Sequence, residues 1–248
     1  MIPLLRAELI KLRTTRTFLA LTGVAVFTSL LICVLVSLLS EPTQKSVLTD
    51  VFTSDTSALF IVILAIVGIT GEWRHRTITS SLLAAPDRLR FLAAKTLAFA
   101  AAGVVLSLLI SIAVAIVGMV ILSSRDLPTP SVGDLIGQII RNAEVAGLLG
   151  GFGLALGSLV RNQPVAIVGV LILAFAIEPT LLALVPDVGR FAPFSALSGS
   201  IQHIPASDIG GSDDLKLLSP AAAWLAMLAW IAVPFAAGAV LLRRRDLN

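Results

Sequence analysis

The stretch LAFAAAGVVLSLLISIAVAIVGMVIL, residues 97–122, decides the fold of this chain. It is a run of 26 residues without a single charged side chain. A helix needs about 20 mostly apolar residues to cross the hydrocarbon core of a bilayer. The run is longer than that, so it predicts a transmembrane helix.

Five further apolar runs flank this stretch. Over the whole chain 57% of the residues are hydrophobic and 13% are charged, against about 45–50% and about 25% in an average soluble domain. We therefore expect an all-α membrane protein with six transmembrane helices and a single domain over residues 1–248, because little polar chain remains for a soluble domain. The second run is short and the fourth contains charges. The five runs are Phe18–Leu39, Ser57–Gly71, Ile136–Val160, Pro164–Val185 and Ala221–Leu242.

The N-terminal segment MIPLLRAELIKLRTTR, residues 1–16, is basic and amphipathic. A cleaved signal peptide has an apolar region of about 7–15 residues, whereas the run that follows here has 22. We therefore expect an uncleaved first span preceded by a helix that lies in the membrane interface. The alternative is a simple charged flank of that span. Four leucines fall near one face of such a helix: Leu4, Leu5, Leu9 and Leu12.

The placement of Lys and Arg predicts the orientation. With six alternating spans and the N-terminus inside, four basic residues fall in the outer segments, whereas acidic residues are the more numerous there. Basic residues in short loops favour the cytoplasmic side, so both termini are expected in the cytoplasm. This distribution also accounts for the net charge of +3 without a nucleic-acid partner. The thirteen inner basic residues are Arg6, Lys11, Arg13, Arg16, Arg74, Arg76, Arg88, Arg90, Lys95, Arg161, Arg243, Arg244 and Arg245; the outer ones are Lys45, Arg125, Arg190 and Lys216.

The polar stretch GEWRHRTITSSLLAAPDRLRFLAAK, residues 71–95, lies between the second and third spans, on the predicted inner side. Basic residues in such a loop are explained in part by the anionic inner leaflet. The loop also has the spacing of a short helix, and Pro86 would end that helix. A short helix on this face suits docking into a groove of another protein. Its apolar face would carry Trp73, Thr77, Ile78, Leu82 and Ala85.

This loop resembles the second cytoplasmic element of ABC-2 type permeases, the membrane subunits of a class of ATP-driven exporters. Arg76 stands where that family often has Gly, so the turn before Thr77 departs from the pattern. The N-terminal LLRAELIKLRTTRTF resembles the opening amphipathic helix of the family through Glu8, Lys11 and Arg16, and the C-terminal LLRRRDLN resembles its usual ending. The loop residues that match in order are Glu72, Thr77, Leu82, Leu83, Pro86, Arg88 and Lys95.

The resemblance implies a permease subunit in the plasma (inner) membrane of a bacterium, with a cytoplasmic coupling helix and no cofactor. Two chains, identical or paralogous, would pair and form the substrate path between them. The chain has no G-x-x-x-x-G-K-[ST] phosphate loop and no Gly-Lys pair, so it is not expected to be an enzyme, and ATP hydrolysis would fall to a separate ATPase subunit. The implied docking residues are Glu72, Trp73, Arg74, Arg76, Thr77, Leu82, Pro86 and Arg88.

Three charged residues fall within predicted spans, namely Arg141, Glu144 and Glu178. Such charges are costly in lipid and usually face the protein interior or water. Arg141 and Glu178 are expected at similar depths, roughly 10 Å below the outer surface at about 1.5 Å per residue. An ion pair between them, which Glu144 could share, is therefore geometrically possible. They could line a substrate path or gate, or fix helix register. Alternatively, residues 134–144 lie in the outer interface.

Two other classes of function stay open. The intramembrane charges could serve an ion-coupled secondary transporter or channel, and a membrane protein without transport activity is the third class. No metal site is expected, because His75 and His203 fall on opposite sides and Cys33 is the single cysteine. Glycines four apart, Gly147/Gly151 and Gly153/Gly157, predict close helix packing within the chain. Residues 191–204 could form a short re-entrant or interfacial helix.

Overall fold

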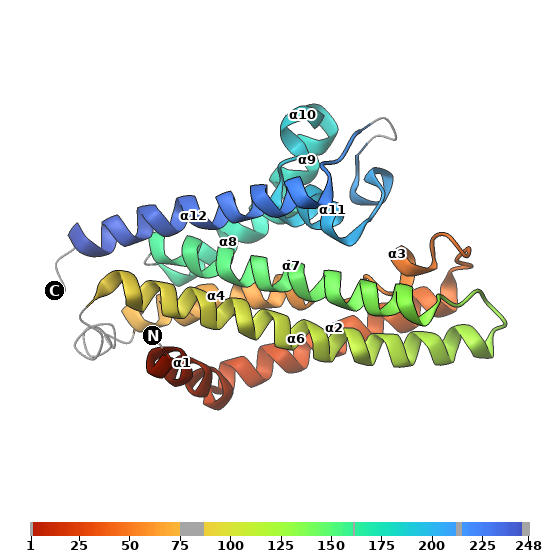
Figure 1. Ribbon diagram of the computed structural model, residues 1–248, viewed down its shortest axis with the longest axis horizontal. Helices are drawn as coiled ribbons and strands as arrows, with labels where there is room; N and C mark the ends of the chain where they lie inside the picture. The colour runs from red at the N-terminus through yellow and green to blue at the C-terminus, as the bar shows by residue number, and fades with distance from the viewer. Residues whose placement is uncertain (1, 75–86, 161, 212–214, 245–248) are drawn as a thin grey trace.

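The computed structural model describes residues 2–74, 87–160, 162–211 and 215–244 (Figure 1). Within these residues the chain is helical, without a strand, and six helices are long and apolar enough to cross a membrane. The predicted all-α membrane protein with six spans is thereby confirmed, and the chain is a multi-pass membrane protein. The six spans are α2 (Arg16–Leu39), α4 (Ser57–Arg74), α6 (Arg88–Ser124), α7 (Val132–Leu159), the composite span Gln163–Leu184 and α12 (Pro220–Arg244).

Shorter elements connect these spans. Helix α1 precedes the first span, α3 follows it, and a group of short helices lies between the fifth and sixth spans, beside the start of α12 (Figure 1). Their bounds are α1 Ile2–Thr14, α3 Val47–Val51, α8 Gln163–Ile172, η1 Leu173–Ile177, α9 Glu178–Leu184, α10 Pro186–Gly189, η2 Pro193–Leu197, α11 Ser198–Gln202 and η3 Ala206–Ile209.

Helix α7 is the centre of the bundle. It packs against α4, α6 and α12, and its glycines allow the backbones to approach closely. A Cβ at Gly150 would lie 2.6 Å from the carbonyl oxygen of Phe99 in α6, and one at Gly153 would lie 2.8 Å from the Cα of Val62 in α4. Small residues serve this purpose at helix contacts in membranes. The expected close packing within the chain is confirmed, and α7 is one unbroken helix from Val132.

Helix α6 is much longer than its apolar run. It begins at Arg88, nine residues before Leu97, because Asp87 caps its first turn and accepts hydrogen bonds from the amides of Leu89 (3.1 Å) and Arg90 (3.2 Å). Side chains that accept from these otherwise unpaired amides favour a helix start. At about 1.5 Å per residue its length is roughly 55 Å, against about 30 Å for the hydrocarbon core. The polar start of α6 therefore continues as helix beyond the apolar layer.

The fifth span contains a π-helical turn. Residues Leu173–Ile177 separate α8 from α9 within one continuous helical stretch. After α10, the chain returns through η2 and α11, whose residues are mostly buried against α7 and α12. The short helix expected within residues 191–204 is thus present as η2 and α11, and it ends at His203, which adopts a left-handed conformation (φ 60°).

Helix α1, the end of α4, the start of α6 and the end of α12 lie at the same end of the bundle (Figure 1). We call it the basic end, and the opposite end, where the loop from α6 to α7 lies, the far end. The surface of the basic end carries Arg6, Lys11, Arg74, Arg88 and Arg90.

Candidate functional site

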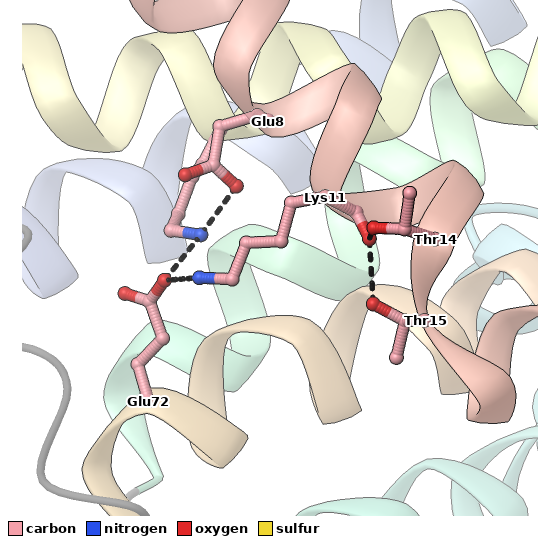
Figure 2. A network of polar contacts seen from close by, with 6 residues as sticks. Glu8, Lys11, Thr14, Thr15 and Glu72 are labelled. Carbon is pink, nitrogen blue, oxygen red and sulfur yellow. Dashed lines mark hydrogen bonds and ion pairs between the residues drawn. The ribbon is translucent and has the colours of Figure 1, made fainter.

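Four charged residues from three helices form one ion-pair network at the basic end. The Lys95 ammonium in α6 lies 2.6 Å from Oε2 of Glu8 in α1 and 2.9 Å from Oε1 of Glu72 in α4. The Lys11 ammonium of α1 pairs with the same Glu72 oxygen (Figure 2). We call these four residues the basic-end network. Glu8 and Lys95 lie 87 positions apart in the sequence. The network therefore joins segments that are distant along the chain.

The local structure of α1 positions its two members. Glu8 and Lys11 are three residues apart, so they lie on one face of the helix; from this face Glu8 pairs with Lys95 of α6 and Lys11 with Glu72 of α4. Where α1 gives way to α2, the Thr15 hydroxyl donates a hydrogen bond of 2.6 Å to the Lys11 carbonyl (Figure 2). This bond, with a weaker one from the Thr14 hydroxyl at 3.2 Å, satisfies a carbonyl in the last turn of α1, where the helix offers no further backbone amide.

The network is balanced in charge and unevenly exposed. Lys95 and Glu72 are 1% and 3% exposed, whereas Lys11 is 51% exposed. Phe91 and Phe99 belong to the apolar cluster around it, and the Lys95 ammonium lies 5.4 Å from the Phe91 ring centroid. A buried charge is tolerated only when paired, and removal of one partner of a buried pair costs about 3–5 kcal/mol. Lys95 is therefore the member on which the arrangement depends.

One acceptor in the network has no donor among the described residues, namely Oε2 of Glu72, which is buried. A cavity of about 390 Å³ lies beside it, lined in part by Glu8, Lys11, Glu72 and Lys95, with Arg74 at its edge. The network therefore borders open space at the basic end, where a further hydrogen-bond donor could enter.

The structure places four of the eight predicted docking residues. Glu72 is buried in the network, so its carboxylate faces the helices and is not at the surface. Trp73 is half-buried against the apolar cluster, and Arg88 is half-buried in the first turn of α6. Arg74 is exposed at the end of α4. The predicted coupling helix lies outside the described residues from position 75 on, and with it Arg76, Thr77, Leu82 and Pro86.

The ion pair between Arg141 and Glu178 that the sequence allows does not form among the residues that the structure describes. The Arg141 guanidinium donates to Oε1 of Gln138 at 3.0 and 3.3 Å. Glu178 is buried and accepts hydrogen bonds from the amides of Phe194 and Ser195 and from the Ser195 hydroxyl, at 2.7–3.1 Å. The first amides of a helical segment lack partners inside it. The start of η2 therefore supplies the donors that the carboxylate needs.

Glu144 also has a partner that the sequence did not indicate. Its Oε2 accepts a hydrogen bond of 3.0 Å from the indole Nε1 of Trp224 in α12. It forms no ion pair with Arg141 among the residues that the structure describes. The three intramembrane charges therefore have three separate environments, and Arg141, Glu144 and Glu178 do not form one cluster.

Sequence reasoning missed a buried acid between α3 and α4. Asp55 is 8% exposed. Its Oδ2 accepts from the hydroxyls of Ser107 and Ser111 in α6, the latter at 2.8 Å, and its Oδ1 accepts from the Ser57 amide at 2.8 Å. No basic side chain pairs with it among the described residues. One signal was present in the sequence, because Ser107 and Ser111 lie four apart, on one face of an otherwise apolar helix.

Asn142 extends this second cluster into α7. Its side-chain amide donates to the Ser111 hydroxyl and to the Phe52 carbonyl, both at 3.0 Å, and its oxygen accepts from Gln138 and Gln202, both at 2.9 Å. All hydrogen-bonding groups of the Asn142 side chain are thus used. Together with Asp55, these residues hold α3, α6, α7 and α11 together. We call Asp55, Ser107, Ser111 and Asn142 the far-end cluster.

A cavity of about 350 Å³ borders the far-end cluster. Asp55 and Thr56 line it on one side, Phe175 of the π-helical turn on another, and Ser195 and Gln202 on a third. π-Helical turns are frequent at functional sites. The cavity therefore combines a buried carboxylate, several neutral hydrogen-bonding groups and an irregular helix wall.

No protein-family model matches this chain, and no characterised protein matches it significantly. Among the described residues, no group of three or more His, Cys, Asp or Glu side chains could hold a metal ion.

Proposed function

We propose that this chain is the membrane subunit of an ATP-driven exporter of the ABC-2 type. Two copies, or one copy and a paralogue, would form the substrate path, and a separate ATPase subunit would bind at the basic end. This end would face the cytoplasm of a bacterium, because it carries most of the basic residues. Helix α1 would lie along the inner interface of the bilayer.

The observation that carries the proposal is the meeting of Glu8, Lys11, Glu72 and Lys95. Each of them belongs to a sequence motif that resembles this class, and the motifs lie in separate parts of the chain. Glu72 lies two residues before the end of α4, and Lys95 lies in the second turn of α6. These are the two ends of the loop that would dock on the ATPase.

The network gives that loop a mechanical connection to the membrane helices. A force applied between Arg74 and Arg88 would act on α4 and α6 together, since Lys95 and Glu72 join them, and Glu8 and Lys11 add α1 to the same unit. Interfaces and packed helices of this kind shift between discrete arrangements as rigid elements. The ATPase would thus move three helices through one loop.

Co-purification tests the partner. The tagged chain, isolated from its native membrane in mild detergent, is expected to bring with it a protein with a phosphate-binding loop, and the complex should hydrolyse ATP in proteoliposomes. Arg74→Glu should weaken the complex about fivefold or more, since a reversed interface charge costs over 1 kcal/mol. Lys45→Glu, at an exposed far-end site, is the matched control. Equal effects of both variants would contradict the proposal.

Cysteine labelling tests the orientation independently. In a Cys33→Ala background, Lys45→Cys should react with a membrane-impermeant maleimide on intact cells. Arg74→Cys should react only after the cells are permeabilised. Labelling of Arg74→Cys from the exterior would overturn the orientation and the cytoplasmic docking together.

A second candidate function is an ion-coupled secondary transporter or channel, and Asp55 favours it. A buried carboxylate beside a cavity, with no basic partner in the part of the chain that the structure describes, is the kind of group that carries a proton or cation across a membrane. In this case the purified chain alone should transport along an ion gradient in proteoliposomes, and Asp55→Asn should abolish that transport. An ATP requirement would exclude this candidate.

A further inference from the structure

A third cavity lies within the predicted membrane layer, between α6, α7 and α12. It has a volume of about 680 Å³ and an almost wholly apolar wall. Its rim includes Leu97, Ile140 and Leu228, which are 51%, 50% and 45% exposed. Because these large apolar side chains lie on membrane-spanning helices, their exposed faces meet the lipid. We call this cavity the lipid-facing groove.

One carboxylate lies in this apolar wall. Glu144 is twelve residues from the start of α7 and fifteen from its end, so it lies near the middle of the span. Its side chain is half-buried, and among the described residues the bond from Trp224 engages only one of its two oxygens. A carboxylate can accept about four hydrogen bonds. Glu144 therefore retains most of its capacity to bind a donor or a cation.

Arg141 on α7 and Lys95 on α6 do not supply that cation. Arg141, three residues earlier on α7, donates to Gln138, and its guanidinium lies against Gly137, toward the start of the helix. Lys95, on α6, is engaged by Glu8 and Glu72. An acidic group left unpaired in lipid is unfavourable, so the groove is matched to an occupant that carries positive charge.

We propose that the lipid-facing groove binds a lipophilic cation, that is, an apolar molecule with one amine or quaternary onium group, which enters from the lipid. The carboxylate of Glu144 pairs with its charge, and the indole of Trp224 both orients the carboxylate and offers a ring face to the cation. The apolar wall receives the remainder of the molecule. A neutral acyl chain is a poorer occupant, because it fills the same space and leaves the acid of Glu144 unpaired. A second copy of this chain is also a poorer occupant, because it presents the same unpaired acid on this face.

The inference concerns binding alone and does not rest on the exporter proposal. It is tested with the full-length chain in nanodiscs of phosphatidylcholine, without an ATPase. The probes are radiolabelled tetraphenylphosphonium and tetraphenylborate, two ions of nearly equal size and apolar character and of opposite charge. Saturable binding of the phosphonium ion, with no saturable binding of the borate, is expected.

Two variants separate charge from space. Glu144→Gln should weaken phosphonium binding about tenfold or more, equivalent to at least about 1.4 kcal/mol. Leu228→Trp keeps the acid but fills the groove, and it should reduce binding to a similar degree. This second variant serves as the test should Glu144→Gln fail to fold. Glu41→Gln, an exposed far-end acid, is the matched control and should bind as the unaltered chain does.

Three results would overturn the inference. Equal binding of both ions would show a merely apolar cavity, and equal loss in Glu41→Gln would show a general surface charge effect. The absence of saturable phosphonium binding to the unaltered chain would show that the groove holds lipid or a second copy. Loss of ATPase co-purification would leave the inference untouched, so the two proposals fail separately.

Discussion

At the basic end Lys95 lies between two carboxylates, whereas at the far end Asp55 accepts hydrogen bonds from hydroxyl and amide groups and has no basic partner among the described residues. Opposite charges cancel in the first case, and the arrangement depends on the buried Lys95. Neutral donors support the carboxylate in the second, and a hydroxyl can turn to donate or to accept. The basic end is thus built as a rigid joint, and the far end as a site that tolerates a change of charge.

The largest expected effect is the loss of Lys95. Lys95→Met leaves the buried Glu72 and the partly buried Glu8 without their common cation, and about 3–5 kcal/mol of unfolding free energy should be lost. Reversible unfolding in mixed dodecylmaltoside and SDS micelles measures it. The triple variant Glu8→Gln, Glu72→Gln, Lys95→Met removes the charges together and should recover part of the loss. If Lys95→Met alone were as stable as the unaltered chain, the basic end would not be a rigid joint.

Glu178→Gln should have an intermediate effect. The Phe194 amide donates to both oxygens of Glu178, and the Ser195 amide donates to Oε2. In Gln one of these oxygens becomes an NH2 group, a donor that faces the donating amides, so a buried donor loses its acceptor at a cost of about 1–3 kcal/mol. The same unfolding measurement applies. Glu41→Gln is the exposed control, with an expected change within about 0.5 kcal/mol. Equal values for both variants would mean that η2 is held by packing alone.

Asp55→Asn tests whether the far-end cluster depends on the charge of Asp55. Asn keeps one acceptor for the serines, and the Ser107 or Ser111 hydroxyl can turn to accept from its amide group, so a loss of only about 1 kcal/mol is expected. Asp55→Leu removes both acceptors and should cost clearly more. If Asp55→Asn were as harmful as Lys95→Met, the far end would depend on the charge, and the distinction between the two ends would disappear.

Lys11→Met should have the smallest effect. Lys11 is 51% exposed, and exposed ion pairs contribute about 0–1 kcal/mol. Glu72 keeps its bond to Lys95 in this variant. The difference between Lys11→Met and Lys95→Met, two lysines on one carboxylate, isolates the effect of burial. Similar losses in the two variants, measured in parallel, would contradict this account of the network.

The six spans could be predicted from the sequence because each is a long run of apolar residues, and this signal needs no knowledge of neighbours. The start of α6 could not be predicted in this way, because the cap at Asp87 lies ten residues before the first residue of the apolar run, Leu97. Similar depth suggested a pair of Arg141 and Glu178, but depth does not fix the direction of a side chain around its helix axis. The contact between the start of η2 and Glu178 is a tertiary contact, and no periodic pattern in the sequence predicts it.

The candidate sites show the same limit. The order of Glu8, Lys11, Glu72 and Lys95 matched known motifs, yet the motifs gave no sign that these residues bind one another. Asp55 fell among the acids of the outer loops, where a solvated position is the usual expectation. The four-residue spacing of Ser107 and Ser111 was the one local signal for a buried polar partner.

The π-helical turn Leu173–Ile177 has a consequence for the geometry of the fifth span. Such a turn holds one residue more than an α-helical turn. Deleting a single residue there would restore regular winding and rotate α8 against α9 by about 100°. Either the face that α8 presents to α4 or the carboxylate of Glu178 would then point elsewhere. The irregular turn thus fixes the rotation of α8 relative to α9 about their common helix axis.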